Sequence, residues 1–249
     1  MGLKFVDKER KPLIGITLDW AKEGSFSTRP HYALRTHYFD AVERAGGIPI
    51  GLPYNENLRE DYINLVDGVL IPGGTMAKPL SWYETGTTKL PYPEMPRCAS
   101  DIWFAEQCLK RHMPFLGICE GMQVLAGVLG CTITADVQKS YNTDLKHHNS
   151  PQTEERVHDV EIIDRTLLAS ILKTNTLKTN TLHREGVVKV SDRVVVSAKA
   201  ADGVIEAIET HPELGHPFAL GIEWHPEYFA QEGESDFNIF AAFVRACRG

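Results

Sequence analysis

The chain has 249 residues, 43% of them hydrophobic, with a formal net charge of −7 and a pI near 5.8. This content supports a sizeable core, and no long Pro/Ser-rich linker interrupts the pattern, so we expect one domain over residues 1–249. No basic stretch could neutralise phosphates, which argues against nucleic acid as a partner, and no apolar run approaches the ~20 residues that cross a membrane.

Short apolar runs alternate with amphipathic segments, which indicates a mixed α/β order. In chain order, the patterns predict strands at residues 13–18, 48–52, 69–71, 114–118, 132–135, 157–163, 187–190, 194–197, 204–208 and 219–225. They predict helices at residues 32–45, 55–65, 100–111, 121–129 and 237–245. The pair Gly46-Gly47 should end the first helix, because glycine suits the residue after a helix C-terminus.

Four polar or Pro-rich segments are predicted as loops. Residues 21–31 are polar, and residues 76–95 carry several prolines and aromatics, which is typical of a long loop over an active-site rim. Residues 172–182 hold Leu-Lys-Thr-Asn-Thr twice, and two copies of five residues indicate a hairpin or loop insertion rather than a repeat fold. Residues 138–153 are expected to form a solvated loop.

The last of these loops contains adjacent histidines, His147 and His148. In an extended segment they face opposite sides, and no acidic or cysteine partner lies at ligand spacing. The five cysteines are odd in number and lack a C-x-x-C pair. We therefore predict no metal and no cofactor. The charged N-terminus lacks the apolar region of a signal peptide, so a cytoplasmic protein with reduced thiols is expected.

The most informative stretch is residues 114–123, where an apolar strand runs through Gly117-Ile118-Cys119-Glu120-Gly121 into a helix. G-x-C-x-G is the sulfur version of the G-x-S-x-G nucleophile elbow, and its glycines leave room for a sharp turn. The helix directs its positive end at the sulfur, so we expect a lowered pKa for the Cys119 thiol. An ordinary buried cysteine is the alternative.

A second motif, His225-Pro226-Glu227, follows an apolar strand near the C-terminus. A carboxylate held against the imidazole fixes its tautomer, which is the base-plus-orienter arrangement that a nucleophilic cysteine needs. The carboxyl ends of strands in an open α/β sheet meet at one rim, so Cys119 and His225 should converge there. A surface loop with an incidental histidine is the alternative.

The turn Pro72-Gly73-Gly74 follows the strand at residues 69–71. Glycines let backbone N–H groups approach a ligand, and a tetrahedral intermediate needs such donors for its oxyanion. We place the N–H groups of Gly74 and Glu120 in that role, against the alternative of an ordinary turn.

These motifs resemble the class I glutamine amidotransferase family and, within it, the γ-glutamyl-γ-aminobutyrate hydrolase (peptidase C26) branch. The resemblance covers nearly the whole chain and is carried by residues 12–17, 38–49 and 68–74 and by GICEGMQ and EWHPE. It implies a flavodoxin-like, three-layer α/β fold, with a mostly parallel central sheet and helices on both faces. A homodimer is common in related folds.

The resemblance also implies roles for individual residues. Cys119 would be the nucleophile, His225 the general base and acid, and Glu227 its orienter. The substrate would be bound by Gly73, Gln123 and His183.

The chain departs from the branch at three places. Glu120 stands where Arg is common, Thr75 replaces an Asp, and residues 180–185 replace an Asn-Ser-x-His-His-Gln stretch, keeping its first histidine as His183. An acidic group beside the sulfur opposes thiolate formation, so Glu120 should face solvent or meet a cation. The branch often carries a histidine at the position of His158, for which a structural role is favoured over a pocket-facing one.

The sequence therefore predicts a hydrolase of small γ-glutamyl amides that works through a γ-glutamyl thioester on Cys119. Two alternatives stay open. One is a glutaminase subunit that delivers ammonia to a separate synthetase. The other is a non-catalytic binding protein on the same fold, its site spoiled by Glu120. The leaving amine is also open.

Overall fold

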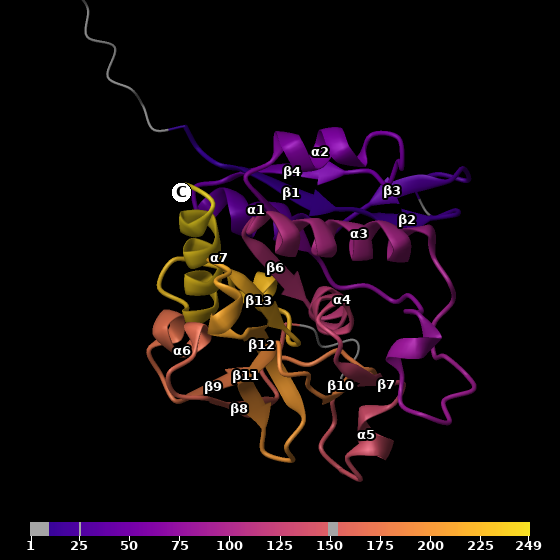
Figure 1. Cartoon of the computed structure of the whole chain (residues 1–249), viewed down its shortest axis with the longest axis vertical. Helices are drawn as coiled ribbons and strands as arrows, with labels where there is room; N and C mark the ends of the chain where they lie inside the picture. The colour runs from indigo at the N-terminus through magenta and orange to yellow at the C-terminus, as the bar shows by residue number, and fades with distance from the viewer. Residues whose placement is uncertain (1–9, 25, 149–153) are drawn as a thin grey trace, which may run out of the picture.

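The structure is a computed structural model that describes residues 10–24, 26–148 and 154–249 (Figure 1). Nine strands form one sheet, in the spatial order β4 (Ile48–Leu52), β1 (Leu13–Thr17), β5 (Gly68–Ile71), β6 (Phe115–Ile118), β13 (Ala219–Ile222), β12 (Ile205–Thr210), β11 (Val194–Ala200), β8 (His158–Ile162) and β9 (Thr176–Thr179). The strands from β4 to β13 pair in parallel, and those from β13 to β9 pair antiparallel.

The parallel strands are short apolar runs, and β5, β6 and β13 are buried along their whole length. Such strands need cover on both faces of the sheet. The predicted α/β fold with a mostly parallel central sheet is confirmed, and antiparallel strands extend that sheet on the β13 side. Two small antiparallel pairs stand apart from it: β2 (Asp19–Ala21) with β3 (His31–Ala33), and β7 (Thr132–Thr134) with β10 (Gly186–Lys189).

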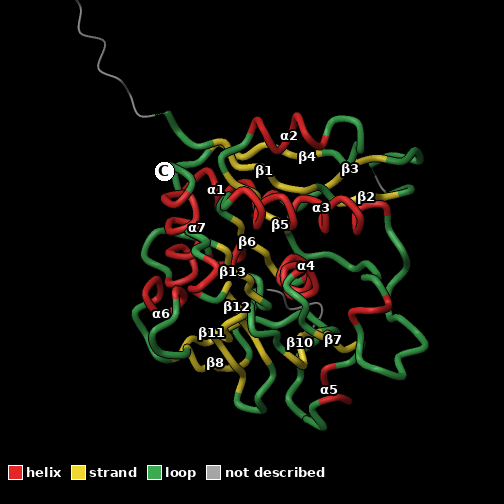
Figure 2. Tube along the Cα trace, viewed as in Figure 1, coloured by secondary structure: helices red, strands yellow, loops and turns green. Residues whose placement is uncertain are grey.

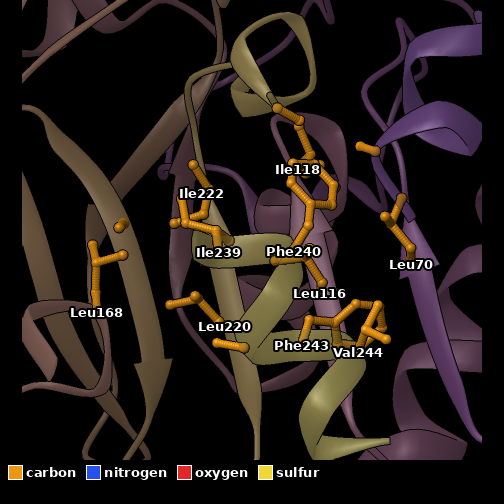
Figure 3. Packing of buried hydrophobic residues seen from close by; sticks show 14 of the residues in the cluster. Leu70, Leu116, Ile118, Leu168, Leu220, Ile222, Ile239, Phe240, Phe243 and Val244 are labelled. Carbon is orange, nitrogen blue, oxygen red and sulfur yellow. The ribbon is translucent and has the colours of Figure 1, made fainter. Parts of the chain in front are cut away.

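Helices cover both faces of the sheet and make two separate cores. One core is formed with α1 (Thr36–Arg44), α6 (Leu167–Leu172) and α7 (Ser235–Ala246), and the other with α2 (Arg59–Leu65), α3 (Pro96–Arg111) and α4 (Glu120–Val128). Figure 2 shows β6 and β13 between α7 and α4. In Figure 3, Phe240 and Phe243 of α7 lie against Leu116 and Leu220 of the sheet. Shorter elements are α5 (Val137–Ser140), η1 (Leu80–Trp82), η2 (Pro212–Leu214) and η3 (Pro226–Phe229).

The predicted strands are confirmed to within a few residues, while several helix starts differ. The first helix begins at Thr36 because Tyr32 belongs to β3, and the second begins at Arg59 after a turn. The third begins earlier, at Pro96, because proline is tolerated in the first helical turn. The C-cap prediction is confirmed by Gly46, which has φ +88° and donates its N–H to the carbonyl of Glu43.

The loop prediction at residues 172–182 needs correction, because Thr176–Thr179 form β9, which pairs with β8 at the edge of the sheet. The loop prediction at residues 21–31 is confirmed for residues 22–24 and 26–30, which join β2 to β3, two strands that the sequence did not predict. The long loop at 76–95 is confirmed, with η1 as its helical turn. Part of the 138–153 prediction, residues 149–153, lies outside the described residues. Among the described residues, no helix is both long and apolar enough to cross a membrane.

Candidate active site

Three neighbouring strands deliver the predicted site residues to one edge of the sheet. In the pairing of β5, β6 and β13, Ile71 lies opposite Gly117 and Ile118 lies opposite Ile222. The Pro72–Gly74 turn leaves the end of β5, Cys119 follows β6 directly, and His225 lies three residues beyond β13. The carboxyl ends of these strands therefore bring the turn, the cysteine and the histidine together.

A pocket of about 530 Å³ lies at this edge and is lined by Gly73, Gly74, Cys119 and His225. Its size suits a small molecule. The rest of its wall is formed by residues that the sequence did not predict to bind substrate: Asp19, Ala33, Leu34, Arg35, Thr75, Tyr92, His148 and Leu182. A larger hollow of about 670 Å³ lies along residues 84–91 and α5, but neither Cys119 nor His225 lines it.

Cys119 sits in a strained turn between β6 and α4, with φ 51° and ψ −104°. Positive φ is unfavourable for a residue with a side chain and must be held by its surroundings. Added methyl groups would not fit at the flanking glycines. A Cβ on Gly117 would lie 2.4 Å from the carbonyl oxygen of Gly121, and one on Gly121 would lie 2.1 Å from that of Ile71. Both glycines are therefore required for the close approach of α4 to the strand ends.

His225 is held from one side by Glu227 and Tyr38. Its Nδ1 lies 2.8 Å from Oε1 of Glu227, and both side chains are buried. The carboxylate accepts, so Nδ1 carries the proton and Nε2 is left available; within the described residues, Nε2 has no hydrogen-bond partner. Burial acts to raise the pKa of Glu227, but His225 and the Tyr38 hydroxyl outweigh it and hold that pKa below its usual range.

The Pro72–Gly74 turn is held from behind by Arg97 at the start of α3. This buried guanidinium donates to the carbonyl oxygens of Pro72 and Gly73 and pairs with Asp101 at 2.7 Å. In a trans peptide the C=O and N–H point in opposite directions. The Gly73 N–H accordingly donates to the Tyr38 hydroxyl at 3.1 Å, and the N–H of Gly74 faces away from Arg97. No local pattern in the sequence marks Arg97 or Tyr38.

The pKa of the Cys119 thiol is raised well above its usual range, which corrects the expectation of a lowered value. Burial is the main cause, and the charges of Glu223 and Glu120 add to it. Lys78 and the backbone N–H of Glu120, which donates to the sulfur, act in the other direction. The start of α4 does act on the sulfur, but desolvation is the larger effect.

Glu120 pairs with a cation rather than facing solvent, the two possibilities predicted for an acid beside the sulfur. It is buried, and its Oε1 lies 2.7 Å from Nζ of Lys78, which comes from the long 76–95 loop. Lys78 also pairs with the buried Glu185, which in turn accepts a hydrogen bond from Tyr83 at 2.6 Å. The acid beside the sulfur therefore shares one buried cation with a second carboxylate.

Two residues predicted to bind substrate do not line the pocket. The amide of Gln123 is buried and donates to Glu223 at 2.6 Å and to the carbonyl of Glu185. His183 is buried too, and its Nδ1 bonds the Glu185 carbonyl at 2.9 Å. Both side chains therefore hydrogen-bond to buried residues, Glu185 and Glu223, rather than facing the pocket. Gly73 and Gly74, by contrast, do line it.

The prediction that His147 lies in a solvated loop is wrong. Its side chain is fully buried, with Nε2 at 2.9 Å from Asp202 and Nδ1 at 3.2 Å from Glu206. His148 faces the other way and is exposed, as the alternation of an extended segment predicts. The acidic partners lie on distant strands and turns, where ligand spacing in the sequence could not reveal them.

Comparisons with known proteins agree with this architecture. The peptidase C26 family model matches residues 12–227. A glutamine amidotransferase-like protein of Rickettsia prowazekii is 32% identical over 96% of this chain and 99% of its own length. The γ-glutamyl-γ-aminobutyrate hydrolase of Escherichia coli strain K12 is 29% identical over 95% and 94%. A crystal structure of a glutamine amidotransferase from Thermotoga maritima matches with a TM-score of 0.54 at 16% identity, covering 88% of this chain and 77% of that one.

Proposed function

Because this chain belongs to the peptidase C26 family, we propose that it hydrolyses γ-glutamyl amides through a covalent thioester on Cys119. The observation that carries the proposal is the shared pocket, which is lined by a cysteine in a strained elbow and by a histidine already held by a carboxylate. This is the combination of nucleophile, base and orienter that acyl transfer needs.

The raised pKa of the thiol means that the sulfur is neutral before substrate arrives. His225 therefore takes the thiol proton at Nε2 as the sulfur attacks the δ-carbonyl carbon. The N–H groups of Gly74 and Glu120 receive the oxyanion of the tetrahedral intermediate. His225 then protonates the leaving amine, the C–N bond breaks and a γ-glutamyl thioester remains. A water molecule gives a proton to His225 and attacks the thioester, which releases glutamate and restores the thiol.

Charges at the pocket wall suit the glutamyl part of such a substrate. The pocket is lined by one carboxylate, Asp19, and one guanidinium, Arg35. A γ-glutamyl group carries an α-amino cation and an α-carboxylate. Asp19 has the charge opposite to the first of these groups, and Arg35 has the charge opposite to the second. The leaving amine would extend toward the remaining wall, where Tyr92 and His148 present aromatic surface.

A panel of γ-glutamyl amides tests the proposal, with glutamine and γ-glutamyl-4-aminobutyrate included. The wild-type chain should release glutamate from at least one member, and mass spectrometry of a rapidly quenched reaction should find a γ-glutamyl adduct on Cys119. Cys119→Ala should lose turnover while its circular dichroism stays unchanged. Cys98→Ala, which removes a half-buried thiol outside the pocket, should keep turnover. Full activity in Cys119→Ala would refute the assignment, and ligand binding without turnover or adduct would favour a binding protein.

The relatives named for glutamine amidotransfer favour a second candidate, a glutaminase subunit that passes ammonia to a separate synthetase. The same panel separates the two. A glutaminase should prefer glutamine, act weakly alone and be stimulated by an added synthetase. A γ-glutamyl amide hydrolase should prefer amides of larger amines and need no partner.

A further inference from the structure

Three histidines and a glutamate meet in a buried cluster on the antiparallel side of the sheet, below the pocket. His147 follows α5, His158 begins β8, His183 lies between β9 and β10, and Glu206 lies on β12. None of the four is more than 7% exposed. The proposed reaction uses none of them, so their burial has no explanation in the chemistry of Cys119.

Three of these residues, His147, His158 and Glu206, have the spacing of a metal site, because one donor atom from each lies within 4.8 Å of the other two. Oε1 of Glu206 lies 3.2 Å from Nδ1 of His147, 3.5 Å from Nε2 of His183 and 3.7 Å from Nε2 of His158. Nδ1 of His147 and Nε2 of His183 lie 3.2 Å apart. Zinc bonds nitrogen and oxygen at ~2.0–2.1 Å, so neighbouring donors in a tetrahedral site lie about 3.3–3.4 Å apart. The separations of 3.2 and 3.7 Å from Glu206 to His147 and His158 lie on either side of that value.

The outer nitrogen of each ring is already bonded to an oxygen. His147 is 2.9 Å from the carboxylate of Asp202, His183 is 2.9 Å from the Glu185 carbonyl, and His158 is 3.4 Å from the Asp159 carbonyl. Carbonyl and carboxylate oxygens only accept, so each outer nitrogen must donate its proton. The inner nitrogen of His158 then directs a lone pair at the cluster, whereas Nδ1 of His147 and Nε2 of His183 share one proton in their 3.2 Å hydrogen bond. Metal-binding histidines are held in this way by a second layer of acceptors.

This shared proton leaves the centre of the cluster with fewer donors than acceptors. Within the described residues, neither oxygen of Glu206 accepts a hydrogen bond of regular geometry, and Nε2 of His158 has no partner. A buried carboxylate without such partners is strongly destabilising, and so is a set of lone pairs facing one another. A cation at the centre satisfies all of them at once.

We propose that His147, His158 and Glu206 bind a divalent cation of the zinc type, with His183 packed beside them. Imidazole and carboxylate donors suit Zn²⁺, and all three ligands are buried and lie outside the active-site pocket, so the site is structural rather than catalytic. His148 and Leu182, which are next to His147 and His183 in the chain, form a β-bridge and line the active-site pocket. The metal therefore ties one wall of the pocket to β8 and β12.

Metal analysis of the full-length chain tests this proposal. The protein is stripped with EDTA, titrated with ZnCl2 by calorimetry, passed through a desalting column and analysed for bound metal. One Zn²⁺ per chain and a higher unfolding temperature are expected, and Co²⁺ in its place should give the visible absorption of a four-coordinate site.

Two neighbouring histidines provide a matched pair of variants. His147→Asn removes a ligand and should lose the stoichiometric zinc, whereas His148→Asn changes the exposed neighbour and should keep it. Asp202→Asn removes the negative charge of the acceptor behind His147, which also accepts from Thr143 and the Val204 N–H, and should weaken binding roughly 10–100-fold. This variant decides the matter if His147→Asn does not fold.

The proposal is overturned if the stripped wild-type chain takes up no stoichiometric zinc, or if the His147 and His148 variants bind it equally. Stability that is indifferent to zinc would show that shared protons hold the cluster. The proposal is independent of the proposed hydrolase activity, because Cys119→Ala should bind zinc as the wild type does.

Discussion

Replacing Lys78 by methionine should destabilise the fold by about 3–5 kcal/mol, because it leaves two buried carboxylates without their cation. The Lys78 Nζ lies 2.7 Å from Glu120 and pairs with Glu185 as well, and none of the three side chains is more than 2% exposed. At an effective dielectric constant of ~20, one such pair attracts by about 6 kcal/mol. The cost of desolvating the charged groups offsets part of this attraction, so the expected loss of stability is about 3–5 kcal/mol.

Urea denaturation at pH 7, followed by circular dichroism, measures the loss. The deficit should shrink as the pH falls, because a carboxyl group whose pKa is raised by folding stabilises the fold at low pH and loses that contribution as the pH rises. Burial and the nearby Glu120 already raise the pKa of Glu185 in the wild type, and removal of Lys78 would raise it further.

A triple variant provides the control for this experiment. Adding Glu120→Gln and Glu185→Gln to Lys78→Met removes all three charges and should recover much of the lost stability. A loss under about 1 kcal/mol in the single variant, or no recovery in the triple variant, would refute the reasoning that unpaired buried charge is the cause.

Three further predictions concern the site itself. Glu120→Gln removes a charge that raises the pKa of the Cys119 thiol, so iodoacetamide should label Cys119 faster than in the wild type at pH 7; unchanged or slower labelling would contradict this. Lysine in Arg97→Lys cannot donate to both carbonyl oxygens behind Gly74, so kcat should fall by up to about 10²-fold while KM stays nearly constant. A loss of folding stability with unchanged kcat would instead assign Arg97 a purely structural role. The pKa of Glu227 is lowered by folding, so its contribution to stability is present above its unfolded value and is lost as the pH falls; Glu227→Gln should therefore lose less unfolding free energy than the wild type between about pH 5 and pH 3, and equal slopes would exclude this role.

Local pattern was sufficient wherever a few contiguous residues decide the outcome. The parallel strands were predicted because burial on both faces demands short apolar runs, and β5, β6 and β13 are such runs. The turn at Cys119 was predicted because Gly117 and Gly121, two residues away on either side, let the helix after the turn pack closely against the strand ends, where a larger residue would clash. Helix starts were less certain, since Thr36 and Arg59 begin helices without a side-chain cap.

Charge and protonation at the site depend on partners that come from elsewhere in the chain. Burial raises the pKa of Cys119 against the expectation from its helix, and burial is a property of the whole fold. Likewise, Glu120 is buried and paired rather than exposed because the long 76–95 loop brings Lys78 into the interior beside it.

The sequence by itself determined the α/β order, the elbow at Cys119 and the His225-Pro226-Glu227 unit, because backbone geometry and hydrogen bonding over a few residues suffice for each. Only the tertiary structure decided which side chains meet in the interior. His147 reaches His183 across 36 residues and Asp202 across 55, and Lys78 reaches Glu185 across 107. Contacts of that range are set by how the sheet and its loops close on one another, so spacing along the chain carries no signal of them.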